Sequence, residues 1–179
     1  MKSKVKITGA EAILLTLLEE HGILLAKASR QLETFINNTA IPVAVSLMGK
    51  SAISADNPNF AGMLGMHGNY APNVLTNQAD LLIAAGMRFD DRVTGDLSRY
   101  AKNARIIHID IDKSELNKNV IADVPVHADI KEFLDEITPA INYKTDKKWV
   151  EQLKQLFSVE NIKVIGKECF PENGKIRCD

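Results

Sequence analysis

The segment Asp80-Leu81-Leu82-Ile83-Ala84-Ala85-Gly86 decides the fold, because it is a continuous apolar run that ends in a glycine. A strand buried on both faces has this pattern, and such strands are typical of parallel sheets. Residues 104–112 repeat the pattern, and residues 124–129 give a shorter version with a predicted helix, 130–141, directly after it. Strands that alternate with helices over short connections predict an α/β, doubly wound, mainly parallel sheet with flanking helices.

The rest of the chain continues this alternation. Apolar spacing predicts helices over residues 25–37 and 72–78, a buried strand over residues 41–47 and an amphipathic helix around residues 149–157. Residues 158–179 have the composition of a linker. Together these segments account for one domain, which is what 179 residues can support.

The composition excludes several classes of protein. With 22 basic and 23 acidic residues the net charge is −1, which lacks the basic excess of a nucleic-acid binder. No apolar run approaches the roughly 20 residues of a membrane span. Cys169 and Cys178 have no CxxC spacing, which disfavours a disulfide framework or a zinc site and suits a reducing cytoplasm. We therefore expect a cytoplasmic protein that binds neither nucleic acid nor membrane.

A nucleotide site is one interpretation of the two strand ends at Gly86 and Asp110, which lie 24 positions apart. A strand-end glycine lets backbone approach a phosphate, and an acidic residue about 20 positions later can accept ribose hydroxyls. Arg88 and Arg92 add forked donors suited to pyrophosphate. The GxGxxG fingerprint is absent. The alternative is that Gly86 only ends a strand and Asp110 is a solvated strand terminus.

Three further features admit two interpretations each. Asp110 and Asp112 could hold a hard cation, although capping or ribose binding is favoured for such a pair. His108, inside an apolar strand, is expected to be a hydrogen-bonded core residue. The turn Leu64-Gly65-Met66-His67-Gly68 allows close backbone approach to a flat ligand, or is a plain strand-to-helix connection.

The segments MLGMHGNYAPN (63–73), LLIAAGMRFDDRVTG (81–95), ARIIHIDID (104–112) and HADI (127–130) resemble the central domain of the acetolactate synthase (acetohydroxyacid synthase) catalytic subunit, a thiamine-diphosphate-dependent enzyme family. The resemblance runs from about His21 to Ile141. Residues 6–22 resemble instead the beginning of the N-terminal pyrimidine-binding domain of the same enzyme.

The resemblance implies that this Rossmann-like domain binds FAD. Carried over position by position, the cofactor-binding residues are Gly22, Leu47, Leu64, Gly65, Met66, His67, Gly86, Arg88, Asp90, Arg92, Val93, Asp110 and Asp129. Met66, Asp91 and Arg92 are implied to lie toward the substrate channel of the full enzyme. The resemblance assigns no catalytic residue and no metal ligand to this chain, since thiamine diphosphate and Mg²⁺ belong to the other domains of the parent enzyme.

The chain departs from the family at its beginning. The sequence jumps from the first helix of the N-terminal domain into the glycine turn after the first central-domain strand, so that this strand is predicted to be missing. Residues 1–20 are expected to form a remnant helix, capped by Thr8 and Glu11 and laid over the open sheet. The alternative is that residues 12–18 form a substitute strand. The expected division is therefore 1–20, a central domain 21–142, and a helix and linker 143–179.

We accordingly predict a truncated central domain of an acetolactate synthase large subunit that is inactive alone. The parent reaction joins two 2-keto acids with loss of CO₂, toward branched-chain amino acids. The alternatives are a stand-alone FAD or adenine-nucleotide-binding module, a remnant without a ligand, and an interaction module that pairs with another copy, as a homo-oligomer, across the gap of the missing strand. Binding of the regulatory subunit of the parent enzyme is not expected to be testable with this chain.

Overall fold

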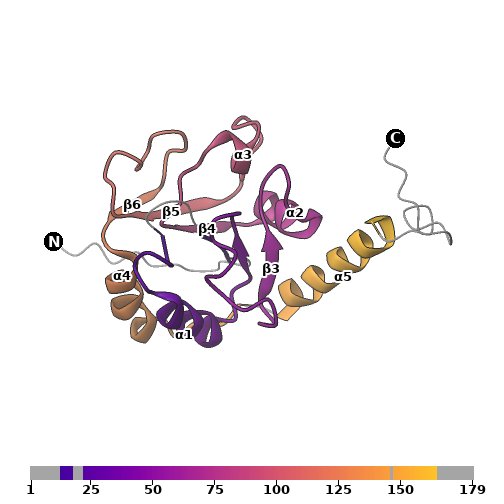
Figure 1. Cartoon of the computed structure of the whole chain (residues 1–179), viewed down its shortest axis with the longest axis horizontal. Coiled ribbons are helices and arrows are strands. Elements are labelled where there is room, and N and C mark those ends of the chain that lie inside the picture. Colours follow the sequence, from indigo (N-terminus) through magenta and orange to yellow (C-terminus); the bar gives the residue numbers. More distant parts are fainter. Residues whose placement is uncertain (1–12, 18–21, 146, 165–179) are drawn as a thin grey trace.

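A computed structural model describes residues 13–17, 22–145 and 147–164 of the chain. Its strands form one six-stranded sheet in the order β3-β2-β1-β4-β5-β6, and every neighbouring pair is parallel. The strands are β1 (Ile13–Leu17), β2 (Val43–Val45), β3 (Phe60–Met63), β4 (Leu81–Ala85), β5 (Arg105–Asp110) and β6 (Val124–His127). The predicted α/β doubly wound class is confirmed (Figure 1).

Helices connect these strands and cover both faces of the sheet. They are α1 (Ser29–Thr39), α2 (Tyr70–Gln78), α3 (Asp91–Thr94), α4 (Ile130–Ile137), the 3₁₀ turn η1 (Thr138–Ala140) and α5 (Lys147–Val164). Four of them overlap predicted helices, although α1 begins at Ser29 and not at residue 25, α4 ends at Ile137, and α5 extends to Val164. The predicted linker is wrong for residues 158–164, which continue α5. The sequence pattern does not indicate β3 and α3, because both are too short to show a clear hydrophobic period.

Strand β1 corrects the predicted helix at the start of the chain. Residues 13–17 pair in parallel with β2 on one side and β4 on the other, with Leu15 opposite both Val43 and Ile83. A helix laid over the sheet would leave the facing N–H and C=O groups of β2 and β4 unpaired, whereas a strand satisfies both rows. The substitute strand is therefore correct for these residues, and the sheet has no gap at its centre. The other residues of the predicted helix lie outside the described part of the chain.

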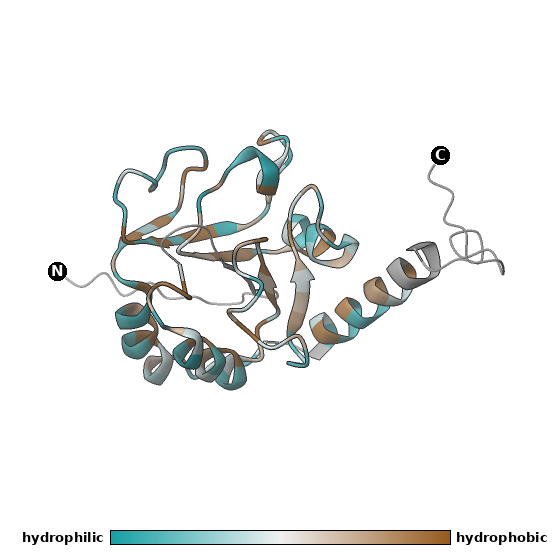
Figure 2. Cartoon of the chain, viewed as in Figure 1, coloured by the Kyte–Doolittle hydropathy of each residue, from teal (hydrophilic) through white to brown (hydrophobic). Residues whose placement is uncertain are grey.

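The alternation of side chains along β4 divides the core into two clusters. Leu81, Ile83 and Ala85 pack in the cluster that includes side chains of α1 and α4. Leu82 and Ala84 pack in the cluster that includes side chains of α2 and α5. Figure 2 shows mainly hydrophobic strands in the middle of the domain and flanking helices in which hydrophilic and hydrophobic residues alternate. This two-faced burial explains why the strand sequence is apolar without interruption.

Helix α5 extends along α2 and leaves the body of the domain at its far end (Figure 1). Leu153 is buried in the second core cluster, and Trp149, Leu156 and Phe157 are partly buried against that cluster. The amide of Gln152 donates to the side-chain oxygen of Gln78 at 2.8 Å. Among the described residues, no helix combines the length and hydrophobicity needed to cross a membrane.

His108 is a fully buried polar residue of β5, as the sequence predicted. Its Nε2 lies 2.8 Å from the carbonyl oxygen of Met87, so this nitrogen carries the proton and donates. Its Nδ1 has no hydrogen-bond partner. Burial lowers the pKa of His108, against the opposing effects of the Met87 carbonyl, Asp110 and Glu115. The side chain is therefore neutral at pH 7.

Replacing Leu15 by proline tests the central position of β1. Proline removes one ladder N–H and leaves a buried carbonyl without its donor, which costs about 1–3 kcal/mol before any steric clash. We expect Leu15→Pro to lower the free energy of unfolding by at least that amount in urea titrations. Leu15→Ile keeps the N–H and an apolar side chain and should cost less than about 1.5 kcal/mol. Equal stability of the two variants would contradict the strand assignment.

The buried His108 makes stability depend on pH in a defined direction. In the unfolded chain a histidine titrates near pH 6.5. Because the folded-state pKa of His108 is lower, its contribution is complete above about pH 6.5 and is lost as pH falls through the folded-state pKa. The wild type should therefore lose up to about 1.4 kcal/mol per pH unit more than His108→Gln. Urea titrations of both proteins at pH 7.5 and 5.5 measure this difference, and the other histidines cancel because both proteins contain them.

Candidate functional site

The carboxyl ends of the strands form the candidate site. From β1 the chain moves outward through β2 to β3, and then from β4 in the opposite direction through β5 to β6, so the order reverses between β1 and β4. In doubly wound sheets ligands bind beyond the carboxyl ends of the strands at this reversal. The predicted residues lie at or after strand ends: Gly22 after β1, Leu47 after β2, residues 64–67 after β3, residues 86–93 after β4, Asp110 as the last residue of β5 and Asp129 after β6.

The turn after β3 is packed so tightly that glycine is required in it. Gly65 has φ +97°, and a Cβ added there would lie 2.6 Å from the carbonyl oxygen of Arg92. A Cβ on Gly68 would overlap the carbonyl oxygen of Met63. The side chains of Met66 and His67 at the tip are exposed. The turn therefore presents two side chains on a backbone that is fixed by close contacts.

Two asparagines that the sequence analysis missed hold this turn. The side-chain oxygen of Asn69 accepts from the N–H of Met63 at 2.9 Å. The amide of Asn73 accepts from the N–H of Gly65 at 3.1 Å and donates to the carbonyl oxygens of Gly65 and Asn69 at 3.0 and 2.9 Å. Their spacing of four residues, across the first turn of α2, places both side chains on one side of the helix. That spacing is the only signal in the sequence that could have indicated their shared role in holding the turn.

The loop after β4 is tied to its neighbours along its length. The N–H of Gly86, at φ +59°, donates to the carbonyl oxygen of Ile109 at 2.7 Å. The amide of Asn119 donates to the carbonyl oxygen of Phe89 at 2.7 Å. Asp90 caps α3 by accepting from the N–H of Val93 at 3.0 Å. Arg88 is half-buried in the middle of this loop.

A direct hydrogen bond joins the two loops. The N–H of Met66 donates to the carbonyl oxygen of Arg92 at 2.8 Å. The exposed side chain of Arg92 follows the exposed Asp91 at the start of α3. The structure thus brings the site residues predicted after β3 and after β4 into contact. Neither sequence segment alone indicates that contact.

The predicted carboxylates are largely engaged in local structure. Asp129 caps α4 by accepting from the N–H groups of Lys131 and Glu132 at 2.7 and 3.3 Å. Asp110, which is 4% exposed, accepts from the N–H of Asp112 at 2.8 Å. Asp112 accepts in turn from the N–H of Ser114 at 2.8 Å. Asp110 and Asp112 each accept from the N–H two residues ahead in a turn, and no helix begins at either residue, so the helix N-cap predicted for this pair is wrong. The described residues contain no group of three His, Cys, Asp or Glu side chains that could hold a metal.

Apolar side chains surround the same edge. Leu47, Met48, Met66 and Ile111 follow β2, β3 and β5 and are 66%, 61%, 71% and 47% exposed. Gly22, after β1, is buried, and its carbonyl oxygen accepts from the N–H of Ala26 at 3.1 Å. Exposed apolar groups gathered at one edge are suited to a flat ligand or to another protein surface.

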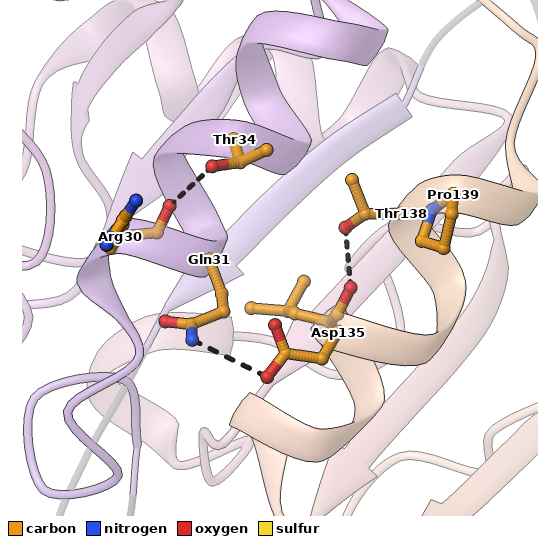
Figure 3. A pocket seen from close by; sticks show the side chains of 7 residues that line it. Arg30, Gln31, Thr34, Asp135, Thr138 and Pro139 are labelled. Carbon is orange, nitrogen blue, oxygen red and sulfur yellow. Dashed lines mark hydrogen bonds between the residues drawn. The ribbon is translucent and has the colours of Figure 1, made fainter.

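A hollow of about 370 Å³ lies elsewhere, between α1 and α4 (Figure 3). The amide of Gln31 reaches across it to the carboxylate of Asp135 at 3.5 Å, and the hydroxyl of Thr138 donates to the carbonyl oxygen of Leu134 at 2.5 Å. None of the predicted site residues line it. The hollow is a seam between two helices, separate from the carboxyl edge of the sheet.

Comparison with known proteins identifies relatives of this chain. Residues 6–137 match the family described as thiamine pyrophosphate enzyme, central domain. The probable acetolactate synthase large subunit of Methanococcus aeolicus is 41% identical over 153 residues, which cover 84% of this chain and 26% of the relative. Acetolactate synthase isozyme 3 large subunit of Escherichia coli is 36% identical over 75% of the chain and 25% of its own length. Acetolactate synthase 1, chloroplastic, of Zea mays is 40% identical over 73% of the chain and 21% of its own length.

The chain thus spans about a quarter of the length of the curated relatives it matches. The matched residues include all six strands, β1 among them, and reach the end of α4, so the similarity covers the whole sheet. From this match and this sheet, we conclude that the chain belongs to the thiamine pyrophosphate enzyme family, as a central domain related to those of acetolactate synthase large subunits.

Proposed function

We propose that this chain is the cofactor-binding central domain of an acetolactate synthase large subunit and that the carboxyl edge of its sheet binds FAD. The observation that carries the proposal is the glycine turn 64–68, packed against α3 beside the loop 86–90 at the reversal of strand order. The strand order 3-2-1-4-5-6 is also that of dinucleotide-binding Rossmann domains.

The residues at this edge fit a flavin dinucleotide. Gly86 turns the backbone at the end of β4 with φ +59°, and Gly65 lets the turn after β3 pack on the Arg92 carbonyl, so both shape the backbone around the ligand. Arg88 and Arg92 provide forked donors for the pyrophosphate. Exposed Met66 and Leu47 offer apolar contact to a flat ring system. This fit rests on the shape of the backbone at the two glycine turns and on the guanidinium hydrogen-bond donors beside them.

Asp90 and Asp129 have a different role in this proposal. Both carboxylates accept hydrogen bonds from the first N–H groups of a helix, α3 and α4 respectively. They therefore fix the helix ends beside the site rather than contact the cofactor directly. Direct contact is proposed for Gly22, Leu47, Leu64, Gly65, Met66, His67, Gly86, Arg88, Arg92, Val93 and Asp110.

The reaction proposed for the complete enzyme joins two 2-keto acids with loss of CO₂. Thiamine diphosphate with Mg²⁺ supplies the carbanion chemistry when bound by the other domains of such an enzyme. The residues of this chain bind and orient: the turn after β3 and the loop after β4 hold FAD, and Met66, Asp91 and Arg92 face the substrate channel.

A second function, an interaction module, is favoured by the exposed apolar residues Leu47, Met48, Met66 and Ile111. A surface of this kind is covered either by a cofactor or by protein. Pairing with another copy across a missing strand is not part of this alternative, because β1 fills that position.

Titration with FAD, followed by quenching of flavin fluorescence, tests the proposed site. We expect saturable binding by the wild type and a loss of at least about tenfold in affinity for Gly65→Ala, whose Cβ meets the Arg92 carbonyl. Each 1.4 kcal/mol of lost binding energy is a factor of ten.

Gly95→Ala is the matched control for this experiment. Gly95 also has a positive φ, +57°, but an added Cβ there has no atom within 4 Å. This variant shares the backbone strain without the clash and should bind FAD like the wild type. Absence of binding by a folded wild type, or equal losses in both variants, would refute the site.

The 179-residue polypeptide should form no acetolactate from pyruvate when supplied with thiamine diphosphate, Mg²⁺ and FAD. The reason is that its sheet and loops belong to the central domain alone, whereas the thiamine site lies in the other domains implied by the resemblance. A colorimetric acetoin assay, with a full-length acetolactate synthase as positive control, measures this. Product above the no-protein background would contradict the expectation.

A further inference from the structure

The side chain of His108 reaches from the core of the sheet to the backbone of the loop 86–90. Its Nε2–H donates to the carbonyl oxygen of Met87 at 2.8 Å, although the two residues are 21 positions apart in the sequence. Its ring meets the ring of Phe89 edge to face, with centroids 5.0 Å apart. One side chain thus holds the residues immediately before and after Arg88.

The remaining backbone anchors of the loop come from other elements. Gly86 is bound to β5 through the carbonyl oxygen of Ile109, and the carbonyl oxygen of Phe89 accepts from Asn119. Asp90 is fixed as the cap of α3. The Met87 carbonyl is held instead by the side chain of His108 from inside the sheet. This hydrogen bond fixes the orientation of the peptide group that joins Met87 to Arg88.

The surroundings of the ring favour one tautomer. The Asp110 carboxylate lies 4.0 Å from Nε2, which supports a proton on that nitrogen. Nδ1 has no partner among the described residues, so a proton there would be buried without an acceptor. Glu115 is the other charged group that acts on this histidine. The ring of Tyr100 meets that of Phe89 edge to face, with centroids 6.0 Å apart.

We propose that His108 is a positioning residue that holds the Met87 carbonyl with its neutral Nε2–H and thereby directs Arg88 toward the phosphates of FAD. The proposal rests on the FAD site put forward above. It gives a binding role to a residue that the sequence marks only as core. It also predicts that His108 acts through Arg88 and not through general stability.

Two substitutions separate the hydrogen bond from the bulk of the side chain. His108→Gln keeps a donor at the position of Nε2, whereas His108→Leu leaves the Met87 carbonyl without one. Tyr100→Phe is the control in the same cluster, because the Tyr100 hydroxyl is buried without a hydrogen-bond partner and its ring remains against Phe89. Urea titration of each variant establishes that the compared proteins are folded.

The first measurement is amide hydrogen exchange of residues 87–90 without FAD. We expect faster exchange in His108→Leu and wild-type rates in His108→Gln and Tyr100→Phe. Unchanged exchange in His108→Leu would overturn the proposal whether or not the protein binds FAD. If the exchange rates are as expected but the wild type binds no FAD, the proposed FAD site is wrong. The role of His108 in holding the loop then stands, but the role of Arg88 in binding FAD phosphates does not.

The second measurement is the FAD dissociation constant in a double-mutant cycle. His108→Leu should weaken FAD binding at least tenfold, and His108→Gln less than threefold. In an Arg88→Gln background His108→Leu should add less than a twofold loss, because the residue through which it acts is gone. Additive losses would overturn the proposal, since they would show that His108 affects binding independently of Arg88.

Discussion

The hydrogen bonds that β1 makes on both of its sides are the interaction on which the rest of the structure depends. Residues 13–17 join β2 and β3 to β4, β5 and β6, and without them the sheet would be two separate halves with four open edges. The reversal of strand order exists only because β1 lies beside β4. Because the loops that follow the strands converge at that reversal, the candidate site is a consequence of the same pairing.

The site itself is built from backbone more than from side chains. Gly65 can approach α3 because it has no Cβ, and the amide of Asn73 adds hydrogen bonds to the N–H and the carbonyl oxygen of Gly65. The Met66 to Arg92 hydrogen bond then makes the loops after β3 and β4 one unit. A charged or flat ligand would meet a surface whose shape is fixed by these contacts, with the arginines and Met66 as the adaptable parts.

The buried polar residues link this surface to the core. His108 satisfies one of its nitrogens on the Met87 carbonyl and leaves the other unpartnered, a cost that a leucine at the same position would avoid. The leucine would, however, leave the Met87 carbonyl without its donor. The hydrogen bond of His108 thus connects the loop after β4 to the core of the sheet.

The sequence by itself determined the parallel sheet, because residues 81–85 form a continuous apolar strand and residues 105–110 a largely apolar one. The family followed from the resemblance of segments 63–73, 81–95 and 104–112 to acetolactate synthase catalytic subunits. It also indicated the site, since residues that follow parallel strands collect at one edge. Only the tertiary structure decided the state of residues 13–17, because their helical spacing was overridden by the unpaired backbone of β2 and β4 on either side. It likewise decided that Asp90 and Asp129 cap helices and that Asn73 and His108 hold the loops. Such roles depend on hydrogen bonds to backbone groups that are brought near only when the chain has folded.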